Sequence, residues 1–138
     1  MPDLILDNEA VQALADPRHR KHRRVLAMVD VLATRGRRGV PHSALIVPAA
    51  VQVEAGWDRG AARSGPLNRL RAQRPGLDGP GADRAAAIVA ALGVSVADAH
   101  VGQVLADIGG APAVLTSDPH DMGRIAAELG VEARIITI

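Results

Sequence analysis

The chain has 138 residues, of which 48% are hydrophobic, so it can bury one core of ordinary size and we expect a single domain over residues 1–138. It contains no cysteine, which excludes disulfides, thiolate nucleophiles and cysteine-based zinc sites. The net charge of +1 hides an asymmetry, because residues 1–74 carry 13 basic and 7 acidic side chains whereas residues 75–138 carry 3 and 8.

The first half of the chain alternates short apolar runs with helix signals. Asp7 and Asn8 follow the first apolar run and favour the start of a helix. Pro48 suits the first position of a later helix, which places Glu54 about two turns inside it. The predicted elements are a strand over residues 4–6, a helix over about 9–15, a helix from after Pro17 to about 34, a strand over 43–47 and a helix over 48–57.

The second half begins with a loop rich in Gly, Pro and Arg, residues 58–82, and then becomes regular. Gly93 separates two alanine-rich helices, and Gly109-Gly110 closes the second of them. The predicted elements are a short helix around residues 67–73, helices over 83–92 and 96–108, a strand over 113–116, a helix over 119–129 and a strand over 132–138. This order predicts an α/β three-layer sandwich around a mostly parallel sheet of four to five strands.

Four acidic residues fall where such a fold places a ligand site. Asp7 and Asp118 follow strands, and ligands bind beyond the carboxyl ends of parallel strands. Glu54 and Asp98 come from helices that begin on the same side, so we expect all four carboxylates to converge. They cannot all stay ionised unless a cation lies among them, and an oxygen-only site suits Mg²⁺ or Mn²⁺.

A metal held in this way supports phosphodiester hydrolysis, the chemistry of a nuclease. We therefore predict a hydrolase whose catalytic residues are Asp7, Glu54, Asp98 and Asp118, with Asp7, Asp98 and Asp118 as the metal ligands. Each acid also has a structural explanation. Asp7 and Asp118 stand at helix N-cap positions, Asp98 lies three residues after Ser95 as in a capping box, and Glu54 suits an exposed helix face. Caps and ligands occupy the same ends of the same elements, so the two interpretations are compatible.

The basic residues of the first half form clusters that suit a phosphate backbone, which arginine and lysine bind with release of counterions. The clusters are Arg18, Arg20, Lys21, Arg23 and Arg24; Arg35, Arg37 and Arg38; and Arg59, Arg63, Arg69, Arg71 and Arg74. We predict that RNA contacts Arg20, Lys21, Arg24, Arg59 and Arg63. Solvated helix faces in an arginine-rich protein are the alternative explanation.

Four stretches carry a resemblance to a known family: LILDNEAVQAL (Leu4 to Leu14), LIVPAAVQVEAG (Leu45 to Gly56), SVADAHVGQVLA (Ser95 to Ala106) and VLTSDPHDMGRIA (Val114 to Ala126). In order and approximate spacing they resemble PIN domains, and most of all the VapC-type ribonuclease toxins of type II toxin-antitoxin systems. The resemblance covers nearly the whole chain, and its most specific part is the last block, with Thr116, Asp118 and Asp121.

The resemblance implies an endoribonuclease that needs Mg²⁺ or Mn²⁺ and whose acids match Asp7, Glu54, Asp98 and Asp118 of this sequence. The lack of cysteine and of an export signal leads us to expect a cytoplasmic protein. Thr116 and Asp121 would support the site. The resemblance further implies a homodimer and a cognate antitoxin whose C-terminal segment occupies the acidic groove. One position departs from the family pattern: two residues after the first aspartate the family usually has Ser or Thr, whereas this chain has Glu9. Glu9 is either a supplementary ligand or a solvated residue favoured by the helix dipole.

Several other functions compete with a nuclease. A non-catalytic PIN-like scaffold that binds RNA or a partner is the main alternative. A phosphoaspartate receiver domain is disfavoured because it needs a lysine near the site, and Lys21, the only lysine, precedes the second strand. Sheet-type RNA binders need aromatic platforms, and Trp57 is the only aromatic residue. No apolar run approaches the roughly 18 residues that span a bilayer, so we expect no membrane association.

Overall fold

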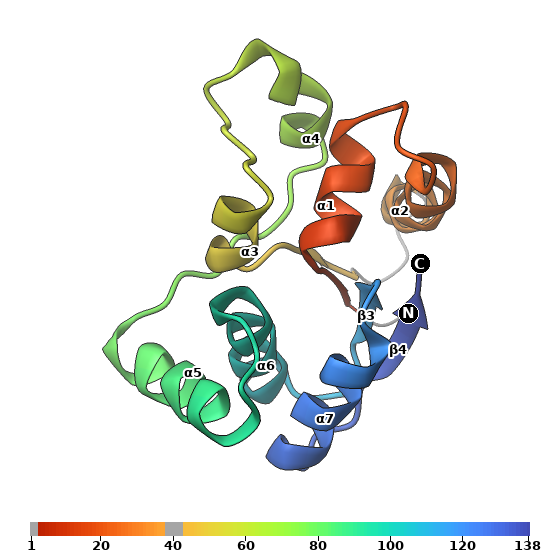
Figure 1. Ribbon diagram of the computed structural model, residues 1–138. Helices are drawn as coiled ribbons and strands as arrows, with labels where there is room; N and C mark the ends of the chain where they lie inside the picture. The colour runs from red at the N-terminus through yellow and green to blue at the C-terminus, as the bar shows by residue number, and fades with distance from the viewer. Residues whose placement is uncertain (1–2, 38–42) are drawn as a thin grey trace.

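The computed structural model describes residues 3–37 and 43–138 and shows three layers, with one sheet between two groups of helices (Figure 1). The sheet has the order β2-β1-β3-β4, and every neighbouring pair is parallel. Its strands are β1 (Leu4–Leu6), β2 (Leu45–Ile46), β3 (Ala113–Thr116) and β4 (Arg134–Thr137). The predicted α/β sandwich around a parallel sheet is confirmed, with four strands.

The two central strands, β1 and β3, are buried along their whole length. They pair in register, with Leu4 opposite Ala113 and Leu6 opposite Leu115. A strand covered by helices on both faces reads as an unbroken apolar run, as both of these do. Their carboxyl ends, at Asp7 and Thr116, therefore lie side by side at one edge of the sheet.

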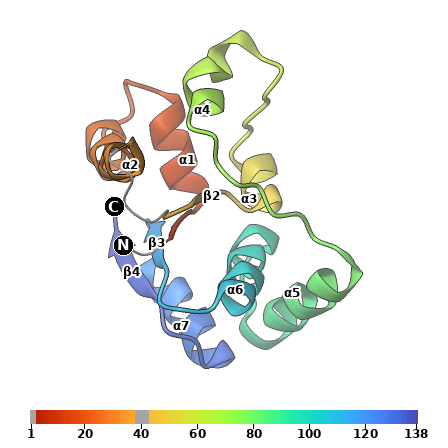
Figure 2. The same ribbon diagram turned by 180° about the vertical axis from the view of Figure 1, so that it is seen from behind.

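The helices are α1 (Asn8–Ala15), α2 (His22–Arg37), α3 (Ala49–Glu54), η1 (Ala62–Ser64), α4 (Gly65–Arg69), α5 (Gly79–Leu92), α6 (Val96–Ile108) and α7 (Pro119–Leu129). Figures 1 and 2 show α1 and α2 on one side of the sheet and α6 and α7 on the other. The chain moves from β1 to β2 in one direction and then back past β1 to β3 and β4 in the other. Because crossovers between parallel strands are right-handed, these two directions place their helices on opposite faces of the sheet.

Helix α6 is the centre of the second helical layer, since it packs against α3, α5 and α7. Its close approach to its neighbours depends on Gly102. A Cβ at that position would come within 2.7 Å of Ile125 Cγ2 and 3.0 Å of Ile88 Cδ1. Among the described residues no single helix is long and apolar enough to cross a membrane; only α5 and α6 taken together pass that test, and they are bent by 120° at their break.

Several predicted boundaries differ from the observed ones. Helix α5 begins at Gly79 rather than at residue 83, because Asp78 caps it by accepting the Gly81 N–H at 2.7 Å. Helix α3 ends at Glu54 rather than at Trp57, whose indole N–H turns away to Asn68 Oδ1 at 3.0 Å. The short helical piece predicted at 67–73 lies earlier, as η1 and α4. The strand predicted over 43–47 is reduced to β2, whose outer edge is covered by a bridge from Ile46 to Gln73.

Candidate acidic site

Asp7 lies at the carboxyl end of β1 and caps α1, as the sequence predicts. Its Oδ1 accepts the Ala10 N–H at 3.0 Å and its Oδ2 accepts the Ser117 N–H at 3.2 Å. The carboxylate is also hydrogen-bonded to the Thr116 side chain, and the residue is only 6% exposed. Burial raises the pKa of Asp7, and these hydrogen bonds offset part of that rise. Asp7 is thus a fixed and nearly enclosed carboxylate.

Thr116 ends β3 and is fully buried. Its hydroxyl is bonded to the Asp7 carboxylate and also accepts the Asp118 N–H at 2.9 Å. This double role ties the first residue after β1 to the turn after β3. The structure therefore places Thr116 where the sequence expects a supporting residue.

Asp98 stands in the first turn of α6, opposite the sheet edge. Its N–H is capped by Ser95 Oγ at 3.1 Å, which is one half of the predicted capping box, and the Ser95 side chain is also bonded to the Asp98 carboxylate. Burial, and then the nearby charges of Asp7, Glu54 and Asp121, raise the pKa of Asp98 to about 6. Carboxylates from three other elements are therefore close enough to act on Asp98 electrostatically.

Glu54 reaches this group from the exposed end of α3. Helix α3 is held against α6 by His100, a fully buried residue whose Nδ1 accepts the Ala50 N–H at 3.1 Å. Burial lowers the pKa of His100, so the ring is neutral and serves this contact. We infer that His100 is a structural residue that sets the position of Glu54 relative to Asp98.

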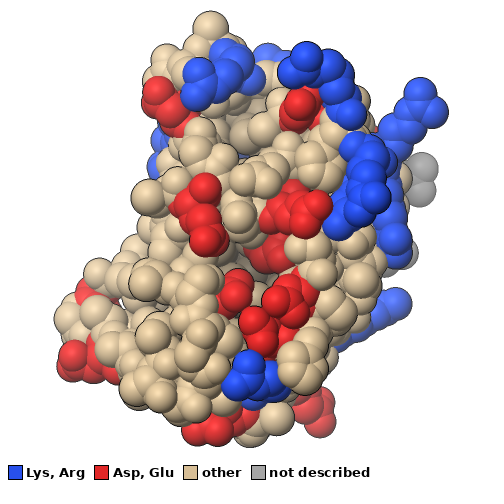
Figure 3. Space-filling view, in the orientation of Figure 1, with Lys and Arg blue, Asp and Glu red and all other residues tan. Residues whose placement is uncertain are grey.

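Asp118 and Asp121 occupy the first turn of α7. Asp118 is exposed and caps the helix by accepting the Asp121 N–H at 3.1 Å. Asp121 pairs with Arg124 at 3.0 Å and is one of the carboxylates that raise the pKa of Asp98. Figure 3 shows acidic side chains gathered in the middle of this face of the molecule. Asp121 is thus close enough to act on Asp98 electrostatically, although the sequence predicts only a supporting role for it.

The chemistry of this group suits a hard divalent cation, because its donors are carboxylate oxygens. Among the described side chains, those of residues 3–32 and 43–138, neither Asp7 nor Asp98 forms an ion pair, so within that part of the chain their charges lack a cationic partner. In the same described residues no three acidic or histidine side chains stand close enough to hold a metal as they are placed.

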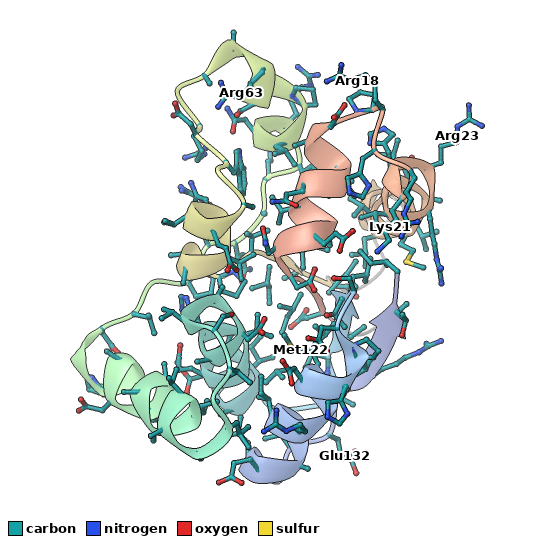
Figure 4. The ribbon with its side chains drawn as sticks, in the orientation of Figure 1. Arg18, Lys21, Arg23, Arg63, Met122 and Glu132 are labelled. Carbon is teal, nitrogen blue, oxygen red and sulfur yellow. The ribbon has the colours of Figure 1, made fainter. Side chains whose placement is uncertain are left out.

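The basic clusters differ in how their side chains are used. Arg20, Arg24, Arg59 and Arg63 are exposed, and Figure 4 shows Arg23 pointing away from the molecule. Lys21 instead pairs with Glu9 at 3.0 Å and is only 15% exposed. It therefore lies beside α1, near the acidic site, although it precedes β2 in the sequence. The side chains of Arg35, Arg37 and Arg38 lie outside the described part of the chain.

Glu9 does not contribute to the acidic group as a free carboxylate. Hydrogen bonds from Ser117 and Lys21 lower the pKa of Glu9, and His19 Nε2 lies 3.7 Å from its Oε1. The histidines of this region are structural as well, since His22 Nδ1 donates to the Ala13 carbonyl at 2.7 Å. The sequence interpretation missed Ser117, whose only signal was its position between Thr116 and Asp118.

The fold and the site together define an α/β protein with a parallel sheet whose carboxyl edge carries a group of acidic side chains. No family model matches the sequence, and no curated protein matches it either. Among solved structures the chain is similar to one in the crystal structure of FitAcB from Neisseria gonorrhoeae, with a TM-score of 0.56 and 16% identity over 95% of this chain and 96% of that chain. At this identity the similarity shows a shared fold.

Proposed function

We propose that this protein is a metal-dependent endoribonuclease of the PIN type that hydrolyses RNA phosphodiesters. The observation that carries the proposal is that Asp7, Glu54 and Asp121 lie near enough to Asp98, at the carboxyl edge of a parallel sheet, for their charges to raise its pKa. Two segments of the N-terminal half of the sequence, residues 16–24 and 58–74, carry exposed arginines that could bind phosphates. Figure 3 shows basic side chains in the upper part of the same face as the acidic group.

Asp7 and Asp98 are the residues best suited to hold Mg²⁺ or Mn²⁺, with Glu54 and one acid of α7 completing the set. Such an ion, when bound, supplies charge neutralisation and acidifies water for attack on a phosphodiester. Asp7 is oriented by its bonds to Ala10, Ser117 and Thr116 and needs little rearrangement. Asp98 and Glu54 stand on helix ends, where side-chain rotation can adjust their spacing.

The biological role we propose is that of a VapC-type toxin in a toxin-antitoxin pair. A cognate antitoxin is the partner, and a homodimer is the assembly. The acidic group suits a partner segment that places a cationic side chain among these carboxylates. Such a segment would block the substrate and neutralise the negative charge at the same time.

The alternative is a PIN-like scaffold that binds RNA or a partner and does not cut. The spacing of the acidic side chains, which is wider than a metal requires, is the observation that favours it. The two functions differ in whether RNA binding depends on a metal and whether product forms.

The test is cleavage of total cellular RNA by purified, antitoxin-free protein with Mg²⁺ or Mn²⁺, with and without chelator. We expect Asp98→Asn to lower the cleavage rate by about two orders of magnitude or more, because it removes a ligand charge. Asp83→Asn, on the exposed face of α5, is the matched control and should cut like the wild type. Metal-independent RNA binding without cleavage by the folded wild type would favour the scaffold.

The same assay decides which acid of α7 takes part. Asparagine is as good an N-cap as aspartate, so Asp118→Asn removes the charge and keeps the cap. If Asp118 is a ligand, as the sequence predicts, this variant loses activity; if Asp121 is the ligand, Asp121→Asn loses activity and Asp118→Asn retains it.

A further inference from the structure

The side chain of Glu9 joins three segments that are separate in the sequence. It belongs to α1, its Oε1 is 3.0 Å from Lys21 Nζ in the segment before α2, and it accepts a hydrogen bond from the Ser117 side chain in the turn after β3. The His19 Nδ1 accepts the Lys21 N–H at 3.1 Å, so the neutral ring carries its proton on Nε2, the atom that faces Glu9. The carboxylate is thus surrounded by donors.

The Lys21–Glu9 pair in this cluster is more enclosed than an ordinary surface ion pair, whereas Ser117 is itself exposed. The Lys21 and Glu9 side chains are 15% and 32% exposed, whereas those of Arg18 and Asp16, a pair at the other end of α1, are 91% and 46% exposed. Figure 4 shows Lys21 beside α1, while Arg18 lies at the periphery. Enclosed and hydrogen-bonded charges hold a defined geometry better than exposed pairs do.

Ser117 links this cluster to the acidic site because it is bonded on two sides. Its hydroxyl is held by Glu9, and its backbone N–H donates to Asp7 Oδ2 at 3.2 Å. Any shift of the turn at Ser117 therefore moves a donor of the Asp7 carboxylate. Glu9 and Lys21 do not touch the centre of the acidic group themselves.

We propose that Glu9, Lys21 and Ser117 form a clamp that positions the Asp7 carboxylate for metal binding. This inference rests on the proposed function and adds positioning residues to its site. It also explains why a long acidic side chain is useful at position 9: it spans from α1 to both Lys21 and Ser117, which a serine or threonine is too short to do. Glu9 acts through Ser117 and is not a metal ligand.

The first test needs no metal and measures amide hydrogen exchange of residue 117 in the full-length protein. We expect Glu9→Ala, Lys21→Ala and Ser117→Ala to raise this exchange about tenfold after correction for intrinsic rates, because the turn loosens locally. Glu9→Gln keeps an acceptor for Ser117 and should retain most of the protection. Asp16→Ala, which removes the exposed pair just after the C-terminal end of α1, is the control and should leave exchange at residue 117 unchanged. Unchanged exchange at residue 117 in the three clamp variants overturns the proposal.

The second test is Mn²⁺ affinity measured by calorimetry on the same proteins. Loss of a residue that orients a metal ligand typically lowers affinity ten- to a hundredfold, and we expect about tenfold for Glu9→Ala and Ser117→Ala. Asp7→Asn should lose most of the Mn²⁺ binding. Glu9→Gln, unlike Glu9→Ala, should bind Mn²⁺ with an affinity near the wild-type value. Clamp variants with wild-type affinity, beside an Asp7→Asn variant that loses it, overturn the clamp.

The two tests separate the clamp from the proposed function. If the wild type binds no Mn²⁺, the proposed metal site fails, and exchange at residue 117 then decides alone: lost protection in the clamp variants supports the clamp, and retained protection overturns it.

Discussion

The acidic edge and the basic segments of this protein are built in opposite ways. Asp7 is 6% exposed and held by donors from three residues, each fixed by the sheet or by a helix end. Arg59 and Arg63 are exposed and form no ion pair with any described residue. The comparison teaches that the fold holds the carboxylates of the proposed metal site in place, while the arginines of the proposed RNA-binding surface extend into solvent.

The acidic edge carries an electrostatic cost that the basic segments lack. Burial and neighbouring carboxylates destabilise the charged form of Asp98, so the scaffold must hold it there against repulsion. Exposed arginines pay no such penalty, since water solvates them. Changes at the acidic edge should therefore alter folding stability, and changes in the basic segments should alter binding alone.

The largest effect on stability is expected where α6, which carries Asp98, packs on its neighbours. Gly102→Ala would place a methyl group 2.7 Å from Ile125 Cγ2, so we expect the free energy of unfolding to fall by about 1–3 kcal/mol. Gly123→Ala on α7 is the matched control, because its Cβ would meet only Ile135 Cδ1 at 3.9 Å. That variant should be stabilised by up to about 1 kcal/mol through helix propensity. Urea denaturation measures both, and equal effects would show that α6 packs less tightly than described.

A smaller effect is expected from the titration of Asp98. Its pKa in the folded protein is raised to about 6, so the folded state retains a proton that the unfolded state has already lost. The stabilisation that this retained proton gives the folded state is fully present below about pH 4 and is lost as the pH rises through 6. After allowance for solvent screening, we expect the free energy of unfolding of the wild type to fall by about 1–2 kcal/mol over this pH range, relative to that of Asp98→Asn. Urea denaturation of the two proteins between pH 4 and 8 measures this difference. Parallel stability curves would contradict the raised pKa.

The smallest effect is expected in the basic segments. Arg59→Ala or Arg63→Ala should weaken RNA binding to a similar degree for different RNA sequences and leave unfolding unchanged. Each lost phosphate contact should reduce the slope of log affinity against log salt by about 0.7 for single-stranded RNA. Arg134→Ala, at the far edge of the sheet on β4, is the control. Binding titrations at several salt concentrations check this, and an unchanged slope would mean that these arginines do not contact phosphates.

The parts of the fold that sequence patterns predicted well are those in which local and tertiary preferences agree. The apolar runs of β1 and β3 are buried on both faces, Asp7 and Asp118 cap the helices that follow these strands, and Ser95 caps α6. Two of the boundaries that were missed depend on residues outside the element itself. Trp57 leaves its helix to reach Asn68, and β2 is shortened at an edge that Gln73 covers.

The sequence by itself determined the order of the elements and the placement of Asp7, Asp98 and Asp118 at their ends, because caps and strand ends are local features. Only the tertiary structure decided which side chains act on one another. It brought Asp121 into electrostatic contact with Asp98, placed the only lysine against Glu9, and bonded Ser117 to both Glu9 and Asp7. These relations join residues up to 110 positions apart, and the sheet register that creates them is set by packing of the whole core.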